Sequence, residues 1–365
     1  MTEGRKRDAK APSDVKNVSN AKEDDVDKLF VLGAGASFAA SRPNKQWKNR
    51  STLPKKQSPL DKNFIKALRN RKSKKATGWQ KSLYLNLERD WEALSKLADY
   101  GLEEAIRAHE SRLLFKNEIL KPPGRRTRKF DLFLRDLLWL IPDQLYSCKE
   151  GREKIYEKFV STYFQNLKST RNHILSFNYD TLLDRCLHSK NNNSWNKIYP
   201  DFIGQNTPKT KFPIYLKLHG SINWRVNKAD FDKMLSGHEI SQIFLQGRRF
   251  PPPKNSTAYP CIIPPIQSKP IAHIEQFRIM WKLAGKYLSN CNELYIIGYS
   301  LPEADGLASA LFRTTKNNNL NKITIIDPDI ETLGKWHKML KNRNLKNQNG
   351  KAPEFHYLSD FADLF

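Results

Sequence analysis

The sequence has little cysteine and no long apolar run, and both absences limit what the chain can be. Its four cysteines, Cys148, Cys186, Cys261 and Cys291, are scattered through 365 residues without any Cys-x-x-Cys pair. This spacing indicates neither a disulfide framework nor a zinc ribbon, so we expect no metal site. The longest apolar stretch, 29–40, is far shorter than the roughly 20 residues that cross a bilayer, and the amino terminus is polar. We expect a cytoplasmic protein without a membrane partner.

Acidic residues are scarce in one part of the chain. From Ser41 to Lys81 there are fourteen Lys and Arg against the single Asp61, a surplus of thirteen within a net charge of +25. Such a segment can neutralise phosphates in salt-dependent contact with nucleic acid, or dock on an acidic protein. The alternative is a solvated basic surface without a partner.

Large apolar residues are nearly missing from 1–27, which predicts a flexible arm. From His173 onward, strand-like apolar runs alternate with helical patterns, and a similar run lies near the amino terminus; these runs are 29–32, 173–177, 214–218, 294–297 and 322–326. The alternation predicts the α/β class, with a Rossmann-like, mostly parallel sheet built from 28–40 and 172–365 and covered on both faces.

The segment 41–171 interrupts this pattern after the first strand. Apolar residues recur there every three to four positions, as in Leu83, Leu87 and Trp91, and again over 130–141 and from Ile155 to Leu167. This period predicts a large helical insertion that follows the basic segment. Further along, prolines exclude 250–265 from a central strand and predict a long loop, which could act as a lid over a neighbouring site.

Four short motifs each follow one of the strand-like runs: Gly33-Ala34-Gly35-Ala36-Ser37, Asn178-Tyr179-Asp180, His219-Gly220-Ser221 and Gly298-Tyr299-Ser300. Open α/β sheets bind ligands at the carboxyl ends of their strands, so the motifs together predict one nucleotide site. The glycine-rich turn lets backbone N–H groups approach a pyrophosphate.

Each of these residues also has a purely structural interpretation. The glycine turn could be only a tight turn, Asp180 a helix N-cap and His219 a turn residue. Asp327 follows the run 323–326, where a carboxylate can accept hydrogen bonds from an adenosine ribose; the alternative is a turn aspartate before Pro328. The functional interpretation therefore depends on the four motifs occurring together.

The order of the motifs, Gly-Ala-Gly-Ala-Ser, Asn-x-Asp, His-Gly and Gly-x-Ser-Leu, resembles the sirtuin (silent-information-regulator) superfamily of NAD-consuming proteins. The stretches 177–184, 217–224 and 297–302 look more like the bacterial sirtuin-like branch than like the protein deacylases. The resemblance covers 28–40 and 172–330.

The resemblance implies that NAD is the substrate and assigns roles to residues. Asn178 would order the nicotinamide ribose and a water, Asp180 with Tyr179 would bind the carboxamide, and His219 would be the general base. The turn from Gly33 to Ser37 would hold the pyrophosphate. Gly298 and Ser300 would contact a ribose or phosphate.

The deacylase branch carries a four-cysteine zinc ribbon, which this sequence lacks, so the expected acceptor is water and the products are nicotinamide and ADP-ribose. Where deacylases have a Phe-Arg-Gly loop, this chain has 39–43 and no equivalent arginine is assigned. The resemblance also implies a gated, NAD-depleting effector of antiphage defence. Its activity would await a homo-oligomer or a sensor, helicase or argonaute-type partner.

Two other functions stay open at this point. One is a non-catalytic sensor that binds NAD or ADP-ribose and reports it to a nucleic-acid-handling partner through the basic segment 41–81. The other is a protein deacylase or ADP-ribosyltransferase, which would need a protein substrate as well as NAD.

Overall fold

The structure is a computed structural model. It describes residues 26–42, 64, 81–83, 102, 106, 128–146, 148–151, 154–167, 169–195, 198–200, 213–236, 238–245, 256–263, 271, 274–302, 305–341, 343 and 345–365. Nearly all of the predicted arm, the basic segment and the first half of the helical pattern lie outside these ranges. No helix within them is long and apolar enough to span a membrane.

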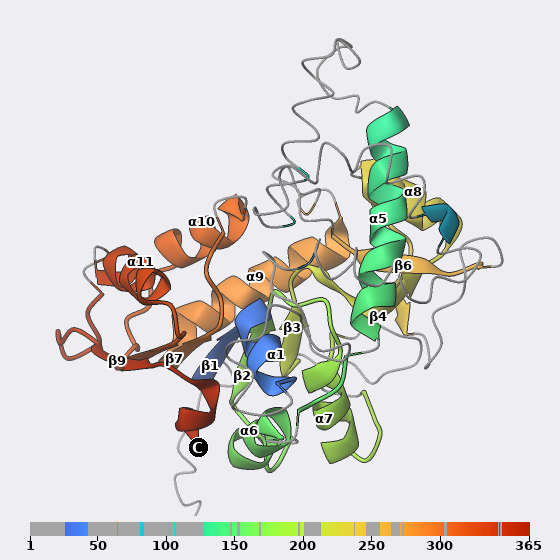
Figure 1. Cartoon of the computed structure of the whole chain (residues 1–365). Coiled ribbons are helices and arrows are strands. Elements are labelled where there is room, and N and C mark those ends of the chain that lie inside the picture. The colour runs from blue at the N-terminus through green and yellow to red at the C-terminus, as the bar shows by residue number, and fades with distance from the viewer. Residues whose placement is uncertain are drawn as a thin grey trace, which may run out of the picture.

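The main sheet has six strands, all parallel, in the order β3-β2-β1-β7-β8-β9 (Figure 1). Counted along the chain within this sheet, the order is 3-2-1-4-5-6, that of a Rossmann-like fold, and the predicted fold class is confirmed. The strands are β1 (Val26–Leu32), β2 (His173–Ser176), β3 (Tyr215–Lys217), β7 (Cys291–Ile297), β8 (Lys322–Ile326) and β9 (Glu354–Leu358).

Helices cover both faces of this sheet (Figure 1). One group is α1 (Ala34–Ala40), α6 (Ile155–Tyr163) and α7 (Leu182–Lys190), in which α6 contacts both of the others. The second group contains α9 (Glu275–Asn290), packed on β1, β3 and β7. It also contains α10 (Gly306–Thr314) and α11 (Ile330–Lys341), packed on one another.

An aromatic cluster fixes α6 against the centre of the sheet. Phe30 on β1 is fully buried, and its ring lies 4.9 Å from Phe159 and 4.8 Å from Tyr163, both on α6. The Phe30 ring also stacks on Tyr295 of β7, at 4.8 Å between ring centroids. Buried aromatic rings contribute much of the apolar area of a core, so this cluster ties the two central strands to the helix layer.

A second, smaller sheet is antiparallel and was not predicted. It has the order β5-β4-β6, with β4 (Gly220–Val226), β5 (Phe244–Leu245) and β6 (Tyr259–Ile262). The helix α8 (Lys228–Ser236) contacts β6, and α5 (Arg128–Tyr146) packs on β4 and β6. The prediction of a loop throughout 250–265 is therefore wrong for 259–262. Pro260 is tolerated because β6 is an edge strand, where a missing N–H costs no ladder bond.

The predicted boundaries shift at two places. The strand β1 begins at Val26, so the last two residues of the predicted arm belong to the sheet, and Asp27 accepts hydrogen bonds from Arg171. The described helices of the predicted insertion are α5 and α6, which coincide with its two later apolar patterns. The earlier pattern around Leu87 and Trp91 lies outside the described residues.

A buried ion pair holds the start of α7 against β3. Lys217 Nζ lies 3.1 Å from both carboxylate oxygens of Asp184, and neither side chain is exposed. Lys217 also donates to the Asp180 carbonyl, and Tyr199 and Tyr215 donate to the Asp184 carboxylate. Every charge in this network thus has several partners, which is the condition under which a buried pair is tolerated.

Asp184→Ala should lower the free energy of unfolding by about 3–5 kcal/mol, because it leaves the Lys217 ammonium buried without its counter-charge. Urea denaturation followed by far-UV circular dichroism measures this change. The matched control is Asp363→Ala at an exposed position, which should change the stability by less than about 0.5 kcal/mol. Equal stability of the two variants would contradict a structural role for the pair.

Candidate functional site

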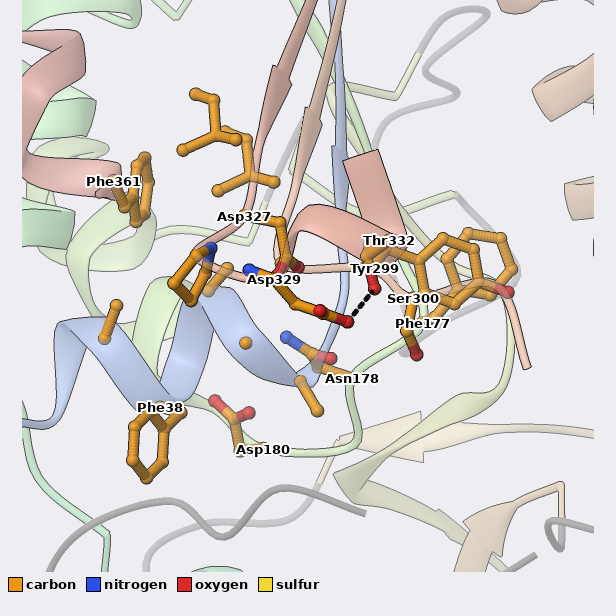
Figure 2. Close-up of a pocket in the computed structure, with 18 of the residues that line it drawn as sticks. Phe38, Phe177, Asn178, Asp180, Tyr299, Ser300, Asp327, Asp329, Thr332 and Phe361 are labelled. Carbon is orange, nitrogen blue, oxygen red and sulfur yellow. Dashed lines mark hydrogen bonds between the residues drawn. The ribbon is translucent and has the colours of Figure 1, made fainter. Parts of the chain in front are cut away.

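A cavity of about 470 Å³ lies at the carboxyl ends of the central strands (Figure 2). It sits where the strand order reverses, between the half that contains β1, β2 and β3 and the half that contains β7, β8 and β9. Rossmann-like sheets bind their ligands at this position. The lining takes residues from all four motifs and the predicted carboxylate: Ala34, Gly35, Ala36, Asn178, Tyr179, Asp180, His219, Gly298, Ser300 and Asp327.

Gly33 and Ser37 do not belong to this lining but support it. Asn178 Nδ2 donates to the Gly33 carbonyl at 2.8 Å and to Ser37 Oγ at 3.0 Å. Ser37 Oγ in turn lies 3.0 Å from the hydroxyl of the buried Tyr156 on α6. The Asn178 side chain is therefore fixed in one orientation by the glycine turn and by α1.

The two glycine-containing turns, after β1 and after β7, pack directly on one another. The Gly33 and Gly35 amides donate to the carbonyls of Ile297 and Gly298, at 3.0 and 2.9 Å. Gly298 has a φ of 58°, and a Cβ there would lie 2.3 Å from the Ala36 nitrogen. Any larger residue at Gly298 would force the turns apart. In this structure the glycines provide close contact between loops, and the Gly33 and Gly35 amides are already engaged within the protein.

The Asp180 side chain lies at the start of α7 and faces the cavity. Its Oδ1 accepts a hydrogen bond from the Leu182 amide at 3.0 Å, so it caps the first turn of α7, and its side chain also lines the cavity. Burial raises the pKa of the Asp180 carboxyl, and the neighbouring Lys217 opposes that rise. A carboxylate kept buried at a cost in stability is typical of a functional position.

His219 is paired with an aspartate that the sequence did not reveal. His219 Nε2 lies 3.5 Å from Asp305 Oδ2, and both side chains are buried. Tyr299 donates to the same carboxylate oxygen at 2.6 Å, and the Phe177 ring packs edge-on against the imidazole at 5.3 Å. A histidine beside a carboxylate is the arrangement in which an imidazole is oriented for proton transfer.

Asp305 immediately precedes α10, so in the sequence it has the position of an ordinary helix cap. In the structure its side chain makes no capping hydrogen bond to α10. The only signal in the sequence was its place five residues after Ser300, in the loop that follows the fourth motif. That spacing alone does not distinguish a cap from a partner of His219.

The cavity lining also contains acidic side chains from the segment that follows β8. Asp327 and Asp329 follow β8, and Figure 2 shows them with Asn178 around the same space. The Asp327 carboxylate accepts from the Asp329 amide at 2.9 Å, so Asp327 also shapes the turn, as its structural interpretation predicted. Asp329 accepts from Thr332 Oγ1 at 2.8 Å. These carboxylates are hydrogen-bond acceptors available to sugar hydroxyls.

Arg42 is the only lysine or arginine among the described residues that line the cavity. Its Nη1 lies 3.3 Å from Asp360 Oδ2, which joins the end of α1 to the carboxyl-terminal segment. A single guanidinium at the rim is suited to neutralising a phosphate group of a bound ligand.

The four cysteines are free, and in the described ranges no group of three His, Cys, Asp or Glu side chains is arranged to hold a metal ion. No protein-family model matches this chain, and no curated protein matches it.

Asp180→Asn should raise the free energy of unfolding at pH 7, because the amide keeps the acceptor for Leu182 without a buried charge. Because the native pKa of Asp180 is raised, the wild type binds this proton more tightly when folded. Its stability relative to the variant should therefore increase as the pH falls through the native pKa towards about 3.9, the unfolded value.

Denaturant titrations at several pH values, on both proteins, measure this difference. Asp180→Ala is the companion variant: it removes the charge and also the cap, so it should be about 1 kcal/mol less stable than Asp180→Asn. A variant Asp180→Asn that is less stable than the wild type at pH 7, by an amount that shrinks as the pH falls, would show that the ionised carboxylate stabilises the fold.

Proposed function

We propose that this protein is an NAD⁺ glycohydrolase that cleaves the bond between nicotinamide and ribose and releases nicotinamide and ADP-ribose. The observation that carries the proposal is that an amide, a carboxylate and an imidazole from distant parts of the sequence, Asn178, Asp180 and His219, line one cavity at the switch point of the sheet. The proposal also uses the resemblance of the motif order to the sirtuin superfamily.

The reaction needs a specific set of groups around C1′ of the nicotinamide ribose. Nicotinamide leaves as a neutral group, and the sugar develops oxocarbenium character as the bond breaks. A carboxylate and an amide nearby can hold the carboxamide and ribose hydroxyls, and a base must accept the proton of a hydroxyl or of the attacking water. We assign Asp180 and Asn178 to holding the carboxamide and the ribose hydroxyls, and His219 to accepting the proton.

The paired carboxylate supports the role given to His219. When the imidazole accepts a proton it becomes a cation, and Asp305 lies 3.5 Å away to stabilise that charge. Tyr299 donates to the same carboxylate and so restricts its orientation. Asp305 is thus a positioning residue, which acts on the substrate through His219.

The rest of the cavity is suited to the adenosine half of the dinucleotide. Asp327 and Asp329 can accept hydrogen bonds from ribose hydroxyls, and Arg42 can pair with the pyrophosphate in place of Asp360. The volume of about 470 Å³ lies within the usual range for ligand pockets. The cavity lining therefore offers polar and charged groups suited to both halves of the dinucleotide.

An unregulated NAD⁺ hydrolase would deplete the cell that makes it, so the proposal includes a gate. Following the resemblance, we propose a gated effector of antiphage defence, whose activity rises when it assembles or when a partner signals infection. The alternatives, an NAD or ADP-ribose sensor and a protein deacylase or ADP-ribosyltransferase, use the same cavity and differ in what is released.

Incubation of the full chain with NAD⁺ alone should release nicotinamide, slowly in the absence of the trigger. Asn178→Ala and His219→Ala should each lower the rate by about a hundredfold or more, since each removes a group that acts at C1′. Chromatography of the products measures the rate, and circular dichroism verifies that the variants are folded. Asn318→Ala and His238→Ala, at exposed positions, are the matched controls and should keep the full rate.

Addition of an acetyl-lysine peptide separates the alternatives. Nicotinamide that appears only with the peptide would indicate a deacylase, and NAD⁺ that binds without any release would indicate a sensor. Full turnover in His219→Ala would contradict the assignment of the base.

Asp305→Asn should lower kcat by about tenfold to a hundredfold with little change in KM, because the imidazole stays in place but loses its adjacent negative charge. The acidic limb of the rate profile should move to lower pH, since protonated His219 is then less stabilised. Tyr299→Phe keeps the ring and loses only its hydrogen bond to Asp305, so it should give a smaller change in the same direction. An unchanged pH profile in Asp305→Asn would show that Asp305 has only a packing role.

A further inference from the structure

A second hollow of about 860 Å³ is lined by α10, α11 and the loop that follows β7. Four cationic side chains line it: Arg313 on α10, Lys335 and Lys338 on α11, and Arg343 just beyond α11. The two helices pack on one another, so the cations of both project into one concave surface. We call this hollow, with these four residues, the basic groove.

In the described part of the chain, no acidic side chain neutralises the four cations of the basic groove. No aspartate or glutamate there belongs to its lining, and none forms an ion pair with any of the four cations. Arg343 is half-buried, and burial lowers the pKa of its guanidinium. Lys335 donates to the Leu301 carbonyl, a neutral partner. Four like charges held together in this way repel one another unless an anion joins them.

The surface between the cations leaves room for such an anion. Gly306, Ser309 and Ala310 on α10 have small side chains, and Met339 on α11 adds an apolar contact. Pro302 lines both the basic groove and the cavity proposed for NAD⁺, so the loop that follows β7 borders both hollows. The loop contains Leu301, a non-glycine residue with a φ of 50°, a backbone conformation that costs energy.

We propose that the basic groove binds a small ligand that carries two or more phosphate groups. Phosphate oxygens accept hydrogen bonds from both arginine and lysine, and arginine can contact them in a bidentate manner. A compact ligand fits a hollow enclosed by two short helices better than a nucleic-acid chain, which needs a continuous basic track. The site is separate from the cavity proposed for NAD⁺ and does not depend on NAD⁺ chemistry.

Isothermal titration calorimetry of the full chain with inorganic tripolyphosphate tests the site. The wild type should bind it with one strong site, and the double variant Arg313→Glu/Lys338→Glu should weaken that site by about a hundredfold, since each charge-assisted contact contributes on the order of tenfold. Both substituted residues are exposed helix positions, so the variant should fold. The matched control is Lys158→Glu, an exposed lysine on α6 outside the groove, which should leave the affinity unchanged.

Two further titrations locate the binding. Arg42→Ala should retain the full affinity for tripolyphosphate, because it alters only the nucleotide cavity, and a loss there would place the ligand in that cavity and overturn the proposal. Weakening per substituted charge that is as large in Lys158→Glu as in the double variant would show attraction to net charge alone. A twelve-nucleotide oligodeoxythymidylate that binds through the groove more tightly than tripolyphosphate would assign it to nucleic acid instead.

Discussion

The contact between the two glycine-containing turns is the constraint on which the rest of the site depends. Gly33 and Gly35 after β1 lie against Gly298 after β7 so closely that a side chain at Gly298 would meet the Ala36 backbone at 2.3 Å. This contact joins the two halves of the sheet at the point where its strand order reverses. The contact sets the position of Asn178, because the side-chain amide of Asn178 donates to the Gly33 carbonyl. It also sets where the loop that carries Ser300 and Asp305 begins.

Buried polar contacts also hold the side chains of the proposed site in place. Asn178 is held through Ser37, the first turn of α7 through the Lys217–Asp184 pair, and His219 through Asp305. Networks of this kind are costly if a member is lost, and they keep catalytic groups in place without help from a ligand. Pro302 lines both the cavity proposed for NAD⁺ and the basic groove, so the two hollows share a border.

The sequence was informative where apolar runs are buried on both faces, as in β1 and β7, and where a motif follows such a run directly. It was uninformative about β9, whose Glu354 and His356 lie on an exposed sheet edge and break the apolar pattern. The prolines led us to predict a loop in place of β6, because proline normally excludes a strand and a sequence does not show which strands will lie at an edge of a sheet. Arg42 and Asp360 are separated by 318 residues, so their contact could not be predicted from the sequence without the fold. The proposed role of the basic segment 41–81 stays a prediction.

The most direct test of the central claim is a structure of the His219→Ala chain determined with NAD⁺ bound. We expect a dinucleotide across the switch point of the sheet, with C1′ of the nicotinamide ribose beside Asn178 and the space vacated by His219, and with the adenosine ribose at Asp327. A dinucleotide bound elsewhere on the molecule, or the opposite orientation with adenine beside Asn178, would contradict it.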